Sequence, residues 1–174
     1  MTLFAIRHGE TAWSLSGRHT GTTDIPLTEH GRLLAERLRP VLARNFSGRA
    51  LCSPMQRARE TCELAGFGQN MVIDPELAEW NYGEYEGKTP EEIHKVKPGW
   101  LIFRDGCPGG ETPEQVGARV DRVIARARLR LRYFVVRART CAARIRGALD
   151  RAARGCWPAL SLGHRHAVRP ELLR

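Results

Sequence analysis

Three short apolar runs in this chain are each followed by side chains that could do chemistry. They are Arg7 and His8 after residues 3–6, Arg57 after residues 50–52, and Glu79 after residues 71–73. Guanidinium groups suit a phosphate because their planar forks donate paired, charge-assisted hydrogen bonds. An imidazole can attack phosphorus, and a carboxylic acid can protonate the leaving oxygen. The combination predicts phosphoryl transfer without a metal or any other cofactor.

Each of these residues, taken alone, also fits a structural role. A histidine after a strand is commonly part of the core, and Arg57 could lie on the solvated face of a helix. Glu79 could simply pair with a nearby arginine. The prediction of a catalytic site depends on their joint occurrence after three strands, together with Gly9, which allows a close backbone approach behind His8.

The elements that must position these residues alternate between strands and helices. The three apolar runs predict buried strands, and helices are expected after Thr28, from Pro54 to Gly66, after Thr89 and after Thr112. Pro40 is expected to end or kink the first of these helices. The alternation predicts an α/β three-layer sandwich, a mostly parallel sheet flanked by helices. Functional residues of such sheets gather beyond the carboxyl ends of the strands.

Five segments, in order, resemble the histidine phosphatase superfamily, in its phosphoglycerate-mutase-like branch. They are residues 7–11 (RHGET), 17–21 (GRHTG), 53–61 (SPMQRARET), 79–87 (EWNYGEYEG) and 108–112 (PGGET). The resemblance covers residues 2–127. It implies a phosphoglycerate-mutase-like fold, a phosphohistidine at His8, phosphate held by Arg7 and Arg57, and Glu79 as the proton donor.

The same resemblance implies a substrate mouth lined by Thr20 and Gly21, with Ser14 as a further substrate-binding residue. Mutases of this family often carry Asn at the position of Ser14, so that phosphate contact is lost or weakened here. The segment between Glu79 and the turn at Pro108 is also short, and mutases place additional substrate-binding residues there. Both departures favour a small-substrate phosphatase over a mutase.

Charge divides the chain at about residue 127. The net charge is +9, yet residues 1–126 are almost neutral, whereas residues 127–174 hold 12 Arg, no Lys and 2 acidic residues. We expect an α/β domain over residues 1–127 and an aberrant, poorly ordered Arg-rich tail over residues 128–174. Nucleic-acid-binding arms usually combine Lys with aromatic residues, so we expect neither a nucleic-acid partner nor a membrane partner.

The family's second catalytic histidine, which follows a late central strand, has no counterpart in residues 128–150. His164 follows Gly163, but Arg165 and Pro170 make a poor continuation of that motif. We therefore expect the C-terminal strand and helix of the fold to be missing or disordered.

We hypothesise that a shifted reading frame produced this tail. Residues 134–150, decoded from the second base of each permitted codon, allow LLFAHGHVLRVFAARWI, a strand with a His-Gly motif followed by a helix. The same offset applied from Gly163, with the last codon ending on the first base of Leu173, allows ten residues that form a second strand, ATGTLSVLSY. We hypothesise that the frame slips between about residues 126 and 133.

The sequence thus predicts a metal-independent phosphatase that hydrolyses small phosphate monoesters through a phosphohistidine and is impaired by loss of its second histidine. The alternatives are a phosphoglycerate mutase and an inactive phospholigand-binding protein. The segment that starts at Met1 has no basic stretch and too short an apolar run for a signal peptide, and the five cysteines show no paired spacing. We expect a cytoplasmic location, and the sequence indicates no oligomeric state.

Overall fold

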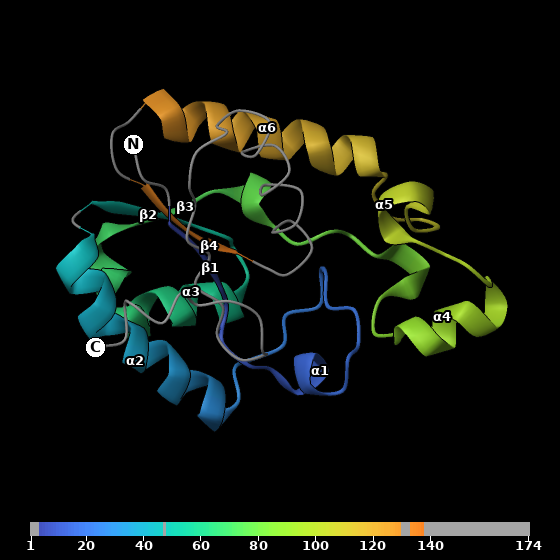
Figure 1. Cartoon of the computed structure of the whole chain (residues 1–174), viewed down its shortest axis with the longest axis horizontal. Helices are drawn as coiled ribbons and strands as arrows, with labels where there is room; N and C mark the ends of the chain where they lie inside the picture. Colours follow the sequence, from blue (N-terminus) through green and yellow to red (C-terminus); the bar gives the residue numbers. More distant parts are fainter. Residues whose placement is uncertain (1–3, 47, 130–132, 138–174) are drawn as a thin grey trace.

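The computed structural model describes residues 4–46, 48–129 and 133–137, the last as backbone (Figure 1). Its sheet has four strands in the order β1-β4-β2-β3: Phe4–Arg7, Tyr133–Arg137, Arg49–Cys52 and Met71–Ile73. All three pairings are parallel. The predicted parallel sheet is confirmed, and the three predicted strands form where the apolar runs lie.

The strand β4 corrects our expectation that the late central strand is missing. Phe134 is in register with Phe4 of β1 and with Ala50 of β2, so β4 lies between those strands. Aromatic and β-branched residues favour strands, and the run Tyr-Phe-Val-Val has that character whatever follows it. The sheet therefore continues past residue 127. Residues 138–174, which include His164, lie outside the described residues.

Helices cover both faces of this sheet, as Figure 1 shows, which confirms the three-layer prediction. On one face lie α2 (Glu29–Asn45), α3 (Gln56–Cys62) and the π-helical turn η1 (Glu63–Phe67). On the other lies α6 (Pro113–Leu129). Each face has its own apolar cluster, one centred on residues such as Leu42 and Cys62 and the other on Trp80 and Val120.

Short elements connect these layers. The single turns η2, η3 and η4 span Gly68–Asn70, Pro75–Leu77 and Gly83–Tyr85. The helices α1 (Ala12–Leu15), α4 (Pro90–Val96) and α5 (Ile102–Asp105) lie to one side of the sheet in Figure 1. The side chain of Thr89 caps α4 by accepting from Glu92 N–H at 3.2 Å, as its position before Pro90 predicted.

We expected Pro40 either to end helix α2 or to kink it, and the helix does not end there. It continues to Asn45, because Leu42 and Phe46 are both buried in the core and keep the last turns in place. Pro40 and Glu36, whose carbonyl loses its helical donor, are exposed to solvent. Water can therefore replace the lost hydrogen bond.

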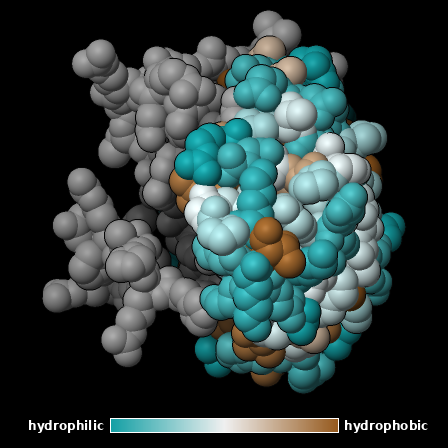
Figure 2. Space-filling view, turned by 90° about the vertical axis from the view of Figure 1, so that its right-hand side faces the viewer, coloured by the Kyte–Doolittle hydropathy of each residue, from teal (hydrophilic) through white to brown (hydrophobic). Residues whose placement is uncertain are grey.

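The surface around α4 and α5 is mainly hydrophilic, with scattered hydrophobic residues (Figure 2). Val96 and Leu101 are the most exposed of these, at 72% and 57%. Among the helices that the structure describes, none is long and apolar enough to cross a membrane.

Candidate active site

A pocket of about 310 Å³ opens between the sheet and the helices α4 and α5. It is lined by Arg7, His8, Ser14, Gly17, Arg18, His19, Thr20, Glu79, Tyr82, Pro90, Ile102 and Phe103. The structure thus brings together five residues that the sequence singled out: Arg7, His8, Ser14, Thr20 and Glu79. Arg57 and Gly21, which were also predicted to be in the site, are not among the residues that line it.

His8 follows β1 directly and is buried, with 5% of its surface exposed. Its Nδ1 lies 2.7 Å from the carbonyl oxygen of Gly9, which can only accept, so Nδ1 carries the hydrogen. Burial lowers the pKa of His8 to about 3, and the positive charges of Arg57 and Arg7 act in the same direction, against the hydrogen bond to Gly9. At neutral pH the imidazole is therefore uncharged, and its Nε2 carries a lone pair.

The loop that carries His8 is held by close backbone contacts. A Cβ on Gly9 would lie 2.6 Å from the carbonyl oxygen of Gly31 at the start of α2, so only glycine fits there. The N–H of Gly9 donates to Thr61 Oγ1 at 2.9 Å, and the Thr61 hydroxyl donates to the carbonyl of Arg57 at 2.7 Å. These contacts tie His8 to both α2 and α3.

Arg57 lies behind the pocket and is completely buried. It donates to the carbonyl oxygens of Thr20, Gly21 and Thr23 at 3.3, 3.0 and 3.0 Å. Burial lowers its pKa, an effect opposed by the negative charges of Glu79 and two further carboxylates. Its Nε has no hydrogen-bond partner among the described residues. Backbone carbonyls thus accept from three of the four terminal N–H groups of the fork that we expected to bind phosphate, which leaves Nε–H and one Nη1–H without a hydrogen bond among the described residues.

Gly21 holds this loop in place instead of lining the mouth of the pocket. A Cβ there would lie 2.3 Å from the carbonyl oxygen of Trp80, which requires glycine. Glu86 Oε1 accepts from the N–H groups of Gly21 and Thr23 at 2.8 and 3.1 Å. Glu86 therefore fixes the loop whose carbonyls hold Arg57. The sequence analysis assigned Glu86 no role.

Ser14 faces the pocket, but its side chain also makes local hydrogen bonds. Its hydroxyl donates to the carbonyl of Thr11 at 2.9 Å and accepts from the Thr11 N–H at 2.9 Å. This reciprocal arrangement caps α1. The hydroxyl hydrogen of Ser14 is thus already in use within the loop, and its contact with phosphate stays a prediction.

Glu79 is 4% exposed and comes from the loop between η3 and η4. Its Oε1 accepts from the N–H of Trp80 at 2.8 Å. This hydrogen bond orients the carboxyl group, and Glu79 is among the residues that line the pocket.

Arg119 of α6 holds the main chain on which Glu79 sits. It donates to the carbonyl oxygens of Glu76, Ala78 and Glu79 at 2.9, 2.7 and 3.2 Å. Its Nε and Nη2 also donate to the two carboxylate oxygens of Glu111, at 2.8 and 2.9 Å. Sequence reasoning missed Arg119, because its partners come from separate segments of the chain. Glu111 belongs to the motif 108–112, but the sequence analysis gave it no role.

His19 and Tyr82 form an aromatic part of the pocket that the sequence analysis did not assign. Their rings stack with centroids 4.5 Å apart and planes inclined by 29°. His19 lies in the motif 17–21 and Tyr82 in the motif 79–87, so the resemblance could have indicated that both residues are near the site. Phe103 belongs to α5, a helix that was not predicted, and only the structure places it at the pocket.

The family model of the histidine phosphatase superfamily (branch 1) matches residues 3–136. The chain belongs to this superfamily. It is 45% identical over 132 residues to an acid phosphatase of Mycobacterium tuberculosis, covering 72% of this chain and 62% of the relative. It is 38% identical to a sedoheptulose 1,7-bisphosphatase of Saccharomyces cerevisiae, covering 70% and 53%. The match to a 2,3-bisphosphoglycerate-dependent phosphoglycerate mutase of Mesorhizobium japonicum is 35%, covering 68% and 64%.

Solved structures agree with this membership. The structure of an open reading frame product from Mycobacterium tuberculosis matches with a TM-score of 0.79 at 36% identity, covering 95% of this chain and 92% of that one. An α-ribazole phosphatase from Shigella flexneri matches with a TM-score of 0.72 at 25% identity, covering 87% and 79%. The relatives are phosphatases and mutases, so the family is one of enzymes, and the chain spans 53–62% of the first two curated relatives.

Proposed function

We propose that this chain is a phosphatase of small phosphate monoesters that works through a phosphohistidine at His8. The observation that carries the proposal is the state of His8, a buried neutral imidazole whose Nδ1–H is fixed on Gly9. This leaves the Nε2 lone pair as the nucleophile. Arg7 lines the same pocket, and Arg57 adds its positive charge from behind. We also propose a cytoplasmic location.

The chemistry takes two displacements at phosphorus. In the first, His8 Nε2 attacks, the bond from phosphorus to the ester oxygen breaks, and Glu79 gives a proton to the leaving alcohol. In the second, a water attacks the phosphohistidine, returns a proton to Glu79 and releases phosphate and free His8. No metal takes part in either step.

We further propose that this chain is impaired, because residues 128–150 contain no histidine to complete the phosphate pocket. Removing one preorganised donor to a developing charge costs on the order of 10² to 10³ in rate. Since β4 is present, this missing donor, and not a missing strand, is the reason that we assign to the impairment.

The experiment compares this chain with a restored chain, in which residues 134–150 and 163–172 carry the sequences that the shifted frame encodes. We expect the restored chain to hydrolyse p-nitrophenyl phosphate on the order of 10² to 10³ times faster. Equal rates in the two chains would show that the missing histidine does not impair this chain. Absence of hydrolysis by the restored, folded chain would remove the phosphatase function. Supplying 3-phosphoglycerate tests the mutase alternative, which predicts isomerisation instead of release of phosphate.

The missing histidine also favours a second candidate, a phospholigand-binding protein without turnover. Arg7 and His8 are in place to hold a phosphate even where the reaction does not proceed. Tight phosphate binding by this chain, combined with no phosphohistidine after long incubation with substrate, would support this candidate over the phosphatase.

A further inference from the structure

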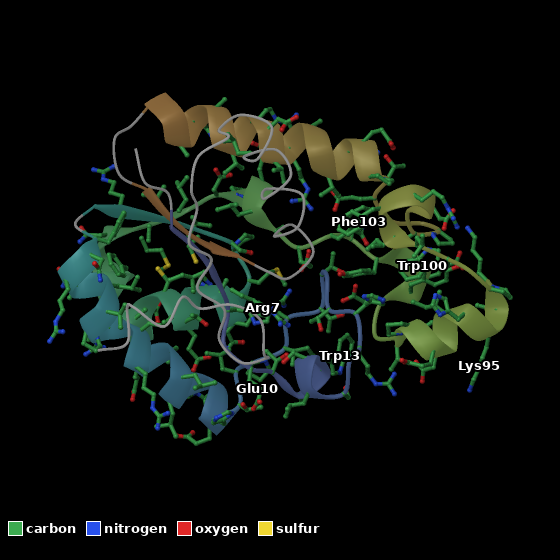
Figure 3. All side chains as sticks on the ribbon, in the orientation of Figure 1. Arg7, Glu10, Trp13, Lys95, Trp100 and Phe103 are labelled. Carbon is green, nitrogen blue, oxygen red and sulfur yellow. The ribbon has the colours of Figure 1, made fainter. Side chains whose placement is uncertain are left out.

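The pocket has two chemically different ends. Arg7, His8 and Glu79 form the charged end, where the proposed function places the phosphate. The other end is lined by the apolar side chains of Ile102 and Phe103, contributed by α5. Figure 3 shows Arg7 on the sheet side and Phe103 on the side of α5. A phosphate bound at the first end directs the rest of its ester toward the second.

Aromatic packing holds the apolar end in a fixed shape. The ring of Phe103 meets Trp80 edge-on, with centroids 5.7 Å apart and planes inclined by 75°. The stacked pair of His19 and Tyr82 is supported in turn by Trp100, whose ring lies 5.5 Å from that of His19. Trp80, Tyr82 and Trp100 are almost completely buried, so this wall is preorganised to receive a ligand.

Phe103 itself remains 46% exposed, although it lines the pocket. Exposed aromatic surface in a concave site is covered favourably by an apolar partner, because burial removes that surface from water. Part of the ring thus remains open for a ligand to cover. Apolar walls with a few placed polar groups are typical of small-molecule sites.

The charge of a second arginine bears on whether the pocket would hold a second anionic group. Arg18 lines the pocket, but its Nη1 donates to the carbonyl of Gly87 at 2.5 Å and to Glu92 at 3.2 Å. The carboxylate of Glu92 compensates the guanidinium, and a second phosphate on the substrate would have to compete with it. A bisphosphate is therefore a poor match for this end of the pocket.

We infer that the substrates are phosphate monoesters whose alcohol part carries an aromatic or bulky apolar group, which packs on Phe103 and Ile102. This inference rests on the proposed function and names the substrate class of the same site. It separates such esters from small polar monoesters and from bisphosphates.

Binding of phosphonates tests the inference without requiring turnover, because their carbon–phosphorus bond is not hydrolysed. The probes are phenylphosphonate, methylphosphonate and propane-1,3-diphosphonate, titrated by calorimetry into the full chain. We expect phenylphosphonate to bind about tenfold or more tightly than methylphosphonate, through its buried ring. We expect the diphosphonate to gain nothing over methylphosphonate. Equal affinities for phenyl and methyl, or tightest binding of the diphosphonate, would overturn the inference.

Variants of α5 test whether the preference for phenylphosphonate comes from the ring of Phe103. In Phe103→Ala, phenylphosphonate should bind at most about threefold more tightly than methylphosphonate, while the affinity for methylphosphonate stays unchanged. Phe103→Leu should keep part of the preference for phenylphosphonate. Leu101→Ala is the matched control, since Leu101 is exposed on the same segment but does not line the pocket, and it should keep the full preference. Equal loss of both ligands in Phe103→Ala would overturn the inference. If none of the three probes nor inorganic phosphate binds, the proposed function fails and this inference fails with it.

Discussion

The two sides of the pocket are held together by different kinds of contact. On the nucleophile side, His8 is fixed by backbone packing at Gly9 and by neutral hydrogen bonds through Thr61. On the acid side, Glu79 depends on an ion pair, because Arg119 and Glu111 clamp its main chain. The first side is therefore sensitive to added volume, and the second to lost charge. This difference predicts which substitutions each side tolerates.

The acid side should show the largest change in rate. In the restored chain, Glu79→Gln removes the proton donor and is expected to slow alkyl phosphates by about 10² to 10⁴. p-Nitrophenyl phosphate should lose far less, because its leaving group needs no proton. Steady-state turnover of both substrates measures the difference, and equal losses would count against the acid role of Glu79.

Breaking the clamp should cost stability on the same side. Arg119→Met leaves Glu111 and the carbonyls of the Glu79 loop without their donor, which is expected to lower the free energy of unfolding by about 3–5 kcal/mol. Arg122→Met on the same helix is the matched control. Its ion pair with Glu76 is exposed, so its loss should cost about 1 kcal/mol or less. Urea unfolding measures both, and similar losses would show that Arg119 is no special support.

Added volume should disturb the nucleophile side instead. Gly9→Ala brings a methyl group against the carbonyl of Gly31, and overpacking of this kind costs about 3 kcal/mol. Gly68→Ala is the control, because its Cβ would meet ordinary contact distances at a negative φ. A Gly9→Ala chain as stable as Gly68→Ala would contradict the close approach that the structure gives to Gly9.

The buried imidazole makes the nucleophile side sensitive to acid. In the unfolded chain His8 takes up a proton near the ordinary histidine pKa of 6.5, whereas its folded pKa is about 3, so the unfolded state binds more protons between these values. Stability should fall as the pH drops through this window, by about 2 kcal/mol between pH 7 and pH 5. His8→Asn removes this contribution, and the difference between the two chains isolates it. An identical pH dependence in both chains would place the imidazole in water.

Local sequence signals were sufficient for the first three strands and for placing His8 and Glu79 at one pocket, because short apolar runs and the residues after them lie close together in the chain. They were not sufficient where distant packing decides. Helix α2 passes Pro40 because Leu42 and Phe46 are buried, and Arg57 donates to carbonyls more than 30 residues away. The late strand was predicted to be missing because the histidine that follows it in the family is absent from residues 128–150. An apolar run follows residue 133 in either reading frame, so β4 forms without it.

Trapping the phosphoenzyme tests the identity of the nucleophile most directly. The restored chain is mixed with radiolabelled phosphate monoester, quenched within milliseconds and digested, and the labelled peptide is sequenced by mass spectrometry. The account predicts a phosphate that is labile to acid and stable to base, carried on His8 and absent from His8→Ala. A label of the same chemistry that persists in His8→Ala, or that maps to another residue, would contradict it.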